Sequence, residues 1–367
     1  MLNNKKIGTK IAIGIGVMVG IILIVMLVVA FNMNQIKNDS EAMDKQYVPE
    51  VQMASSLQGN INEVMLAVRQ YTLTEDKAQV EIINDYIAKA KVNIEEGKAL
   101  VERYPNLVKL KEYIVIAEES LLGYETLINE TEVTINKKAE AMVALNQAAQ
   151  SMIKNVDDYI EDQNTKVLAE IKASALDKAS GRTMKIKRMN EILDFANEIR
   201  IGNFKAQTYR DPKHIDDVTP NFKKIYDDWQ KIYDDTVQQV NIDQLNKIKE
   251  SVKNYETNLV VVRDNFATME ELATKRMEQA NKVVDSTKAI NEAGLTETQT
   301  RASDAVSKMA SALTIMIAGF ILAIVLGIIV NLYIIRNIKR GISRVTDAAK
   351  QFSLGDIDIE LTVDSHD

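Results

Sequence analysis

Apolar residues recur at alternating spacings of three and four through most of residues 32–309. A repeat of about 3.5 residues is typical of long α-helices that pack side by side at shallow angles. The clearest series run through residues 80–101, 107–159 and 245–290. The pattern therefore predicts an all-α fold that is built from helical bundles.

Breaks in this pattern divide the segment into separate helices. In "TLTED", Thr74 is placed as a helix cap with acidic residues in the next turn. Prolines interrupt the pattern in "RYPN" and in "DPKHIDDVTP", and Asn241 and Gln244 form a pair that resembles a capping box. These signals predict six helices, over residues 32–73, 76–103, 106–175, 178–209, 214–239 and 242–309.

The lengths of the six helices predict how they are arranged. If successive helices alternate in direction, a rise of 1.5 Å per residue brings the end of the sixth to within about 15 Å of the starting level of the first. The third and sixth helices then span the full height of roughly 105 Å. The first and second helices pack beside one half of this pair, and the fourth and fifth beside the other. The expected domain is elongated, with two stacked four-helix bundles that share two long helices.

Two uncharged apolar runs flank this segment, at residues 11–31 and 310–335. Each is long enough to cross a hydrocarbon core of about 30 Å as a helix. The first run could be a cleaved signal peptide, but it exceeds the apolar core of about 7–15 residues that is usual for such signals. Its length favours an uncleaved anchor, and the sequence predicts two transmembrane helices.

Basic residues predict the orientation of both spans. Three lysines lie within residues 1–10, and a basic cluster begins at Arg336, directly after the second span. Because positively charged flanks stay on the cytoplasmic side, residues 1–10 and 336–367 are expected in the cytoplasm. Residues 32–309 are then extracytoplasmic, in a protein that crosses the cell membrane twice.

Composition argues against several classes of function. The chain has no cysteine, and its two histidines, His214 and His366, lie in polar stretches that are typical of exposed loops. It has no glycine-rich phosphate loop. Acidic residues outnumber basic ones by 52 to 45, so a basic surface for nucleic acid is not expected. We expect no catalytic residues, no metal, no cofactor and no nucleic-acid partner.

Charged residues interrupt the apolar series at a few positions. Arg276 falls on the series of the sixth helix, Lys138 on that of the third and Arg200 on that of the fourth. Arg69 and Tyr71 lie at opposite edges of the apolar face of the first helix. A charge that faces a bundle core is costly unless it is paired, and arginine can hold a carboxylate through two parallel hydrogen bonds.

Two interpretations of these arginines are open. In the first, Arg69 and Arg276 bind a carboxylate ligand together with Tyr71, because the two arginines lie at distances from the membrane that agree within about 8 Å. Arg200 would then serve a second site in the other bundle. In the second interpretation, the arginines extend to solvent or pair with acidic residues at the edge of the core, such as Glu63, Glu198 or Glu270.

The order of elements resembles a known family. A membrane helix, six helices in two stacked bundles and a second membrane helix, with "NEVMLAVRQYTLTED" at residues 62–76, are similar to the helical bimodular sensor domain. This domain occurs in methyl-accepting chemoreceptors and in some sensor kinases of bacteria. The resemblance implies a small-ligand site in each module, with organic acids as the ligand class, and Arg69 matches the arginine of the motif in the first helix.

The residues after the second span resemble a second family. Apolar positions 338, 342, 345, 349 and 352 are spaced as in a coiled-coil seam, and Leu354 and Gly355 form a plausible helix stop. The alternating stretch "GDIDIELTVDSHD" follows. This order resembles the first helix and the connector of a HAMP linker, although "RNIKRGIS" lacks the proline that is usual there. The second HAMP helix would follow Asp367.

These resemblances imply the sensing part of a homodimeric transmembrane chemoreceptor. An extracellular carboxylate would shift the sixth helix, and residues 310–335 would carry the shift to HAMP and to a cytoplasmic signalling domain. That domain would act on the chemotaxis kinase and its adaptor. Two alternatives stay open: the input half of a sensor histidine kinase, and a membrane-anchored helical scaffold without a small-molecule ligand. Arginines on the core series argue against the scaffold.

Overall fold

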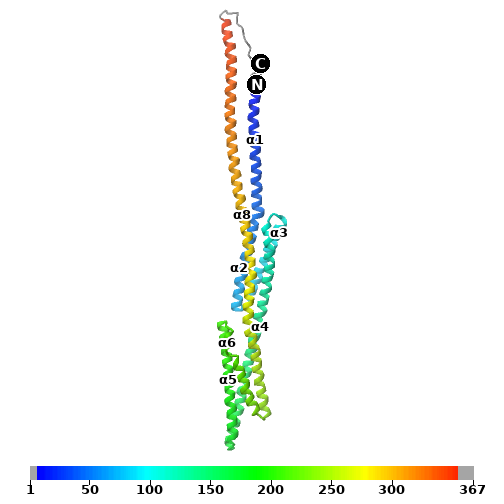
Figure 1. The fold of residues 1–367 in the computed structure, drawn as a ribbon, viewed down its shortest axis with the longest axis vertical. Helices are drawn as coiled ribbons and strands as arrows, with labels where there is room; N and C mark the ends of the chain where they lie inside the picture. Colours follow the sequence, from blue (N-terminus) through cyan, green and yellow to red (C-terminus); the bar gives the residue numbers. More distant parts are fainter. Residues whose placement is uncertain (1–5, 354–367) are drawn as a thin grey trace. The chain divides into compact units, whose positions relative to one another are not determined.

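The computed structural model describes residues 6–353, and this range consists of helices joined by short turns, with no strand (Figure 1). The predicted fold class is confirmed. The HAMP-like connector predicted for residues 354–367 lies outside the described residues. The elements are α1 (Ile7–Ala42), a π-helical turn η1 (Met43–Tyr47), α2 (Val48–Thr74), α3 (Ala78–Arg103), α4 (Val108–Lys172), α5 (Leu176–Tyr209), α6 (Lys213–Asp216), α7 (Pro220–Asp234) and α8 (Gln239–Ser353).

The break in "TLTED" is where the sequence predicts it, but the capping residue differs. Thr74 belongs to the last turn of α2, where its hydroxyl donates to the carbonyl of Gln70 at 2.9 Å. Asp76 caps α3 instead, because its Oδ1 accepts a hydrogen bond from the backbone N–H of Ala78 at 3.0 Å. A short acceptor side chain before the first helical turn satisfies an N–H that has no partner within the helix.

The helix predicted over residues 214–239 is two helices, the short α6 and the longer α7. Pro220 is the first residue of α7. Proline has no N–H to donate, which makes it unfavourable inside a helix and well suited to the first turn. The proline therefore starts a new helix where the apolar pattern alone suggests one continuous element.

The start of α8 is also corrected, from residue 242 to Gln239. The Asn241 side chain, predicted as part of a capping box, reaches across to α4 instead. Its Nδ2 donates to Asp162 Oδ2 at 2.7 Å, and its Oδ1 accepts from Lys166 Nζ at 3.0 Å. The same Nδ2 also donates to Gln244 Oε1 at 3.1 Å, so the predicted pair is in contact, but both residues lie inside α8 and the bond joins two side chains.

The chain divides into two compact units, which we describe separately. The first unit comprises Met1–Ser55, Glu96–Lys111 and Lys288–Asp367. The second unit comprises Ser56–Glu95 and Glu112–Thr287. The helices α2, α3, α4 and α8 each contribute residues to both units.

In the second unit, α4 and α8 run antiparallel and in contact. Residue numbers rise along α4 as those of their partners fall along α8. The hydrogen bonds that show this register join Thr131 to Arg276, Thr134 to Asn265 and Lys166 to Asn241. This pair is the frame on which the shorter helices of the unit are packed.

The shorter helices form two groups around the α4–α8 pair. In one group, Asn60 of α2 donates to Asn93 of α3 at 2.8 Å, and Lys91 of α3 pairs with Glu125 of α4 at 2.8 Å. In the other group, α5, α6 and α7 bury an apolar core against α4 and α8, with members such as Leu145, Tyr159, Met189, Ile192, Ile225, Trp229, Leu245 and Val252. The unit therefore contains two four-helix groups that share α4 and α8, as the sequence predicts, if α6 and α7 together are counted as the predicted fifth helix.

In the first unit, α1 and α8 also run antiparallel, and glycines line their contact. A Cβ atom added at any of these glycines would lie between 2.5 and 3.1 Å from a side chain of the facing helix. Small residues let two apolar helices approach closely. The facing pairs are Gly14 with Val330, Gly327 with Met18 and Gly319 with Val25.

Two helical stretches of the described residues are long and apolar enough to cross a membrane, Gly8–Thr74 and Gln239–Gln351. Large apolar side chains are exposed in their hydrophobic parts, with Leu27 at 71% and Leu332 at 61%. Such exposure suits a surface that contacts lipid rather than protein. These stretches include the predicted spans at residues 11–31 and 310–335.

Polar residues join α1, η1 and α8 next to the first apolar run. Asp39 accepts hydrogen bonds from Lys308 at 2.7 Å and from Arg301 at 3.0 Å, and the bond from Lys308 lowers the pKa of Asp39 most strongly. Arg301 also donates to the hydroxyl of the buried Tyr47 at 3.3 Å. Nearby, Glu50 is only 2% exposed, and burial together with the charge of Glu297 raises its pKa to about 7.

A substitution at Gly202 tests the close contact between α5 and the α6 region. A Cβ atom at this position would lie 2.5 Å from Val218 Cγ2 and 2.7 Å from the carbonyl oxygen of His214. We expect Gly202→Ala to lower the Tm, because the backbone of α6 must shift. The control is Gly181→Ala, since a Cβ atom there has nothing within 4 Å and alanine stabilises a helix by about 0.5–1 kcal/mol. The fluorescence of Trp229, the one tryptophan, reports unfolding in this group, and equal Tm values for both variants would contradict the contact.

The raised pKa of Glu50 predicts that the free energy of unfolding depends on pH. Its pKa is higher in the folded chain than the ordinary value of 4.5, so the folded state keeps a proton that the unfolded chain releases. The free energy of unfolding should therefore fall as the pH rises from 4.5 to about 7, by about 3 kcal/mol at most. Thermal unfolding of Glu50→Gln should lack this component and give a higher Tm than the native chain at pH 8, but not at pH 4.5. The exposed Glu63→Gln is the control, and an unchanged pH profile in Glu50→Gln would refute the assignment.

Candidate ligand-binding site

Arg276 is a buried cation without an ionic partner. It lies on α8 and is 6% exposed, and its guanidinium donates to the hydroxyl of Thr131 on α4. Burial lowers the pKa of Arg276, and the nearby Tyr124 opposes this effect. Within residues 6–353, no carboxylate lies within ion-pair distance of this guanidinium. A single neutral hydroxyl leaves most of its five N–H donors available to a ligand.

The guanidinium borders a cleft of about 460 Å³, which we call the Arg69–Arg276 cleft. α2 contributes Arg69 and Thr72, and α8 contributes Arg276 and the small side chains Ala273 and Ala280. Arg69 is exposed, and no acidic residue lines the cleft. The structure thus brings together the two arginines that the sequence places at similar heights, and the cleft has the charge that attracts a small anion.

Tyr71 does not border this cleft. Its side chain is 2% exposed and packs in the core of the second unit. Burial raises the pKa of the Tyr71 phenol, and the charges of Glu132 and Glu75 add to the effect. A contact between Tyr71 and a ligand stays a prediction. In the structure, Tyr71 occupies the position of a core residue.

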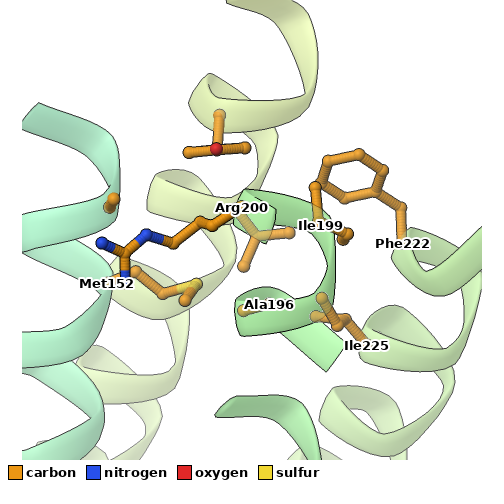
Figure 2. A pocket seen from close by; sticks show the side chains of 9 residues that line it. Met152, Ala196, Ile199, Arg200, Phe222 and Ile225 are labelled. Atoms are coloured by element: carbon orange, nitrogen blue, oxygen red, sulfur yellow. The ribbon is translucent and has the colours of Figure 1, made fainter. Parts of the chain in front are cut away.

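Arg200 lies beside a cavity that is nearly filled. The cavity has a volume of about 10 Å³, room for about one water molecule, and its other lining residues are mostly apolar. Figure 2 shows the Arg200 side chain extending from α5 toward α4, with its guanidinium beside Met152. Its NH1 donates to Asn197 Oδ1 at 3.3 Å. The predicted second carboxylate site therefore has a cation but lacks space for a carboxylate ligand in this conformation.

In the second interpretation, acidic residues at the edge of the core pair with these arginines. In the described part of the chain, none of the three predicted arginines pairs with Glu63, Glu198 or Glu270. Glu198 accepts instead from the amide of Asn221 at 2.7 Å. By contrast, Lys138, the other charged residue on a core series, pairs with Glu75 at 2.7 Å.

Thr131 is a functional candidate that the sequence reasoning missed. It is 1% exposed and accepts the hydrogen bond from Arg276. The signal was present in the sequence, because Thr131 falls between Ile128 and Ile135 at a position where the 3,4 repeat expects an apolar residue. Across residues 6–353, no group of three or more His, Cys, Asp or Glu side chains could hold a metal ion.

Residues 4–180 match a family model described as a four-helix-bundle sensory module for signal transduction, which is found in chemotaxis receptors. The match spans α1–α4 and the beginning of α5, and it includes Arg69 and Tyr71. No curated protein matches the chain. The matched family supports a sensor of the chemoreceptor type.

The hydrogen bond between Thr131 and Arg276 can be tested by stability measurements. Thr131→Val removes the one acceptor of a buried charged donor, which should cost about 1–3 kcal/mol and lower the Tm. Thr131→Ser keeps the hydroxyl and is the matched control. Adding Arg276→Met to Thr131→Val should recover the lost stability, because the unsatisfied charge is then gone. If Thr131→Val and Thr131→Ser unfold at the same temperature, the contact has no energetic importance.

Proposed function

We propose that the chain is the sensing and membrane part of a bacterial chemoreceptor that binds a small extracellular carboxylate. The observation that carries this proposal is Arg276, a buried guanidinium without a carboxylate partner, beside Arg69 in a cleft without acidic residues. A ligand carboxylate would supply the missing counter-charge, and hydrogen bonds from arginine to a carboxylate are among the strongest in proteins. A scaffold without a ligand has no use for this arrangement.

The cleft has two physical features that suit a reversible small-molecule site. Its volume of about 460 Å³ lies within the range of about 300–1,000 Å³ that is typical of ligand pockets. It is open enough for Arg69 to be exposed, whereas Arg276 is desolvated. The exposed cation would capture the anion, and the buried one would hold it in a medium where electrostatic attraction is stronger than in water.

Signal transmission follows from the helix that carries Arg276. α8 is continuous from Gln239 to Ser353, so it contains both the buried arginine and the second apolar run. A ligand that binds one position of α8 more tightly than another shifts the population toward that position. We propose that this shift passes through residues 310–335 to a HAMP linker that begins in residues 336–367.

The wider assignment rests on the sequence patterns together with the family match. We propose a helical bimodular sensor domain over residues 32–309, two spans at residues 11–31 and 310–335, and cytoplasmic termini in a homodimer. The match to a signal-transduction module supports downstream partners, and we propose the chemotaxis kinase and its adaptor. We propose no enzymatic activity for this part of the protein. A sensor histidine kinase would use the same input and differ only in its output domain.

Binding of carboxylates to the detergent-purified chain tests the proposal. We expect at least one carboxylate of two to six carbons to raise the Tm, and the amide of the same acid to leave it unchanged. Titration calorimetry of Arg69→Gln should show affinity reduced by about tenfold or more, the loss expected for a hydrogen bond to a charged group.

The control for this experiment is Arg103→Gln, an exposed arginine at the end of α3 that does not border the cleft. This variant should bind as the native chain does. Absence of any stabilisation across the carboxylate panel would refute a carboxylate sensor. Binding that is equally weak in both variants would show that Arg69 has no specific part in it.

A further inference from the structure

We propose that the first unit contains a proton-binding site that gives the chain a second stimulus, the pH outside the membrane. The site is the Glu50 carboxyl of α2 where it packs against α8, and the contact between the two helices closes when Glu50 takes up a proton. This function goes beyond the binding of a carboxylate, since it concerns another unit, other residues and another kind of stimulus. The side of the membrane on which the pH is read rests on the proposed topology.

Ionisable residues stand on the core positions of α2 and α8 in the first unit. Along α8, the spacing of four and three leads from the buried Ile290 and Gly294 to Glu297 and Arg301. An ionisable group on a core position is costly to stability, so it marks a candidate functional position. The buried positions of α2 follow the same spacing, and they are Glu50, Ala54, Leu57, Ile61, Val64, Val68 and Tyr71.

Glu50 is tightly packed but has no bonding partner. A Cβ atom added at Gly294 of α8 would lie 3.2 Å from Glu50 Oε2 and 2.7 Å from Val51 Cγ2. Within residues 6–353, no hydrogen bond or ion pair holds the Glu50 carboxyl, and the residue is 2% exposed. Burial without a partner disfavours the charged form of a carboxyl group. The packing of α2 on α8 therefore selects the protonated form.

The charged groups beside Glu50 come from α8 and from the preceding helix. α8 presents Glu297 and Arg301, whose Oε2 and Nε atoms are 3.8 Å apart. Asp39 of α1 and Tyr47 of η1 both accept hydrogen bonds from Arg301. The guanidinium is thus held by other partners, and the carboxylate of Glu297 stays close to that of Glu50.

The segment between α3 and α4 adds no titratable partner. Asn106 Nδ2 donates to Gln46 Oε1 at 2.9 Å and to the hydroxyl of Tyr47 at 3.5 Å. Among the described residues, Glu297 is the one charge that shifts the pKa of Glu50, and together with burial it raises this pKa to about 7. The titratable side chains of the segment are half-buried at Lys98 and Tyr104 and exposed at Glu96, Glu102, Arg103, Lys109 and Lys111.

The helix changes its hydrogen bonding just before Glu50. The π-helical turn η1 interrupts the α-helix at Met43–Tyr47, and Pro49 follows with no N–H to donate. Single π-helical turns inside α-helices are frequent at functional sites, and they are among the few causes of helix kinks. This turn gives α2 a point at which it can change direction relative to α1.

Loss of the proton would place two like charges, those of Glu50 and Glu297, in one contact. The deprotonated carboxylate favours a form in which α2 has turned away from Gly294 and water reaches Glu50. The proton binds the closed form more tightly than the open form, whose carboxyl has the ordinary pKa of 4.5. Each pH unit between 4.5 and about 7 can therefore raise the ratio of open to closed molecules by up to about tenfold. α8 continues from this contact into the second apolar run.

The distance between two spin labels on the detergent-purified full chain measures this response. The chain has no cysteine, so Gln52→Cys on α2 and Gln299→Cys on α8, both at exposed positions, can be labelled selectively. The inference predicts that a population with a longer distance grows as the pH rises from about 5 to about 8. Glu50→Gln is neutral at every pH, so it should keep the short distance throughout.

Two further variants of α8 make the test specific. Glu297→Gln removes the like charge that favours the protonated form, so its open population at about pH 8 should be smaller than that of the native chain. Glu292→Gln is the matched control, since Glu292 is exposed on the same helix and lies outside the core positions. This control should respond to pH as the native chain does.

Several outcomes would overturn the inference. The label distance does not change with pH, or it changes equally in Glu50→Gln. Loss of helical circular dichroism over the same pH range would show unfolding instead of a local opening, and it would also count against the site. Carboxylate binding at fixed pH is a separate measurement. A constant distance in a chain that binds carboxylates through Arg69 would refute the proton site alone, whereas a pH response in a chain that binds no carboxylate would refute only the carboxylate sensor.

Discussion

The antiparallel pairing of α4 with α8 is the constraint on which the second unit depends. Each helix presents an apolar series to the other, and hydrogen bonds from Thr131–Arg276 to Lys166–Asn241 keep one register along the pair. Each of the shorter helices has an apolar face that a single helix cannot bury by itself. They bury their apolar faces by packing on the pair, because burial of apolar area is the main favourable contribution to folding. Any displacement of α8 is therefore felt in both four-helix groups.

Arg200 and Arg276 differ in the space that surrounds their side chains. Arg200 extends across a cavity that has room for about one water molecule, so its aliphatic part fills space between helices. Arg276 is more deeply buried than Arg200, and it borders two clefts of about 460 and 440 Å³. A desolvated cation is costly unless something pairs with it. Its position between two open spaces is consistent with a partner that enters from outside.

The sequence predicted most of the fold because the heptad spacing is a local signal that repeats many times. It located the arginines for the same reason, since a charge interrupts an otherwise apolar series. The predicted starts of two helices were wrong. At the start of α8, Asn241 makes a tertiary hydrogen bond to Asp162, and α7 begins at Pro220, which has no N–H to donate. The local pattern also showed no sign of the left-handed conformations of Glu75 and Arg210, because these residues are unusual there and the surrounding contacts, not the local sequence, hold them. The partner of Lys138, 63 residues away along the chain, was likewise beyond any local pattern.

The glycine contacts between α1 and α8 restrict how far these helices can slide. Gly14 faces Val330 and Gly319 faces Val25, with no space for even one additional carbon atom. Sliding α8 by one helical turn, about 5.4 Å, would bring Ile315 toward Val25 or Ile334 toward Gly14. In the first case isoleucine would face Val25 where glycine does now, and in the second the longer isoleucine would face Gly14 in place of valine. The close packing leaves only displacements much smaller than a turn, or rotations about the helix axes. Any sliding of these two helices along one another is therefore limited to a fraction of a turn.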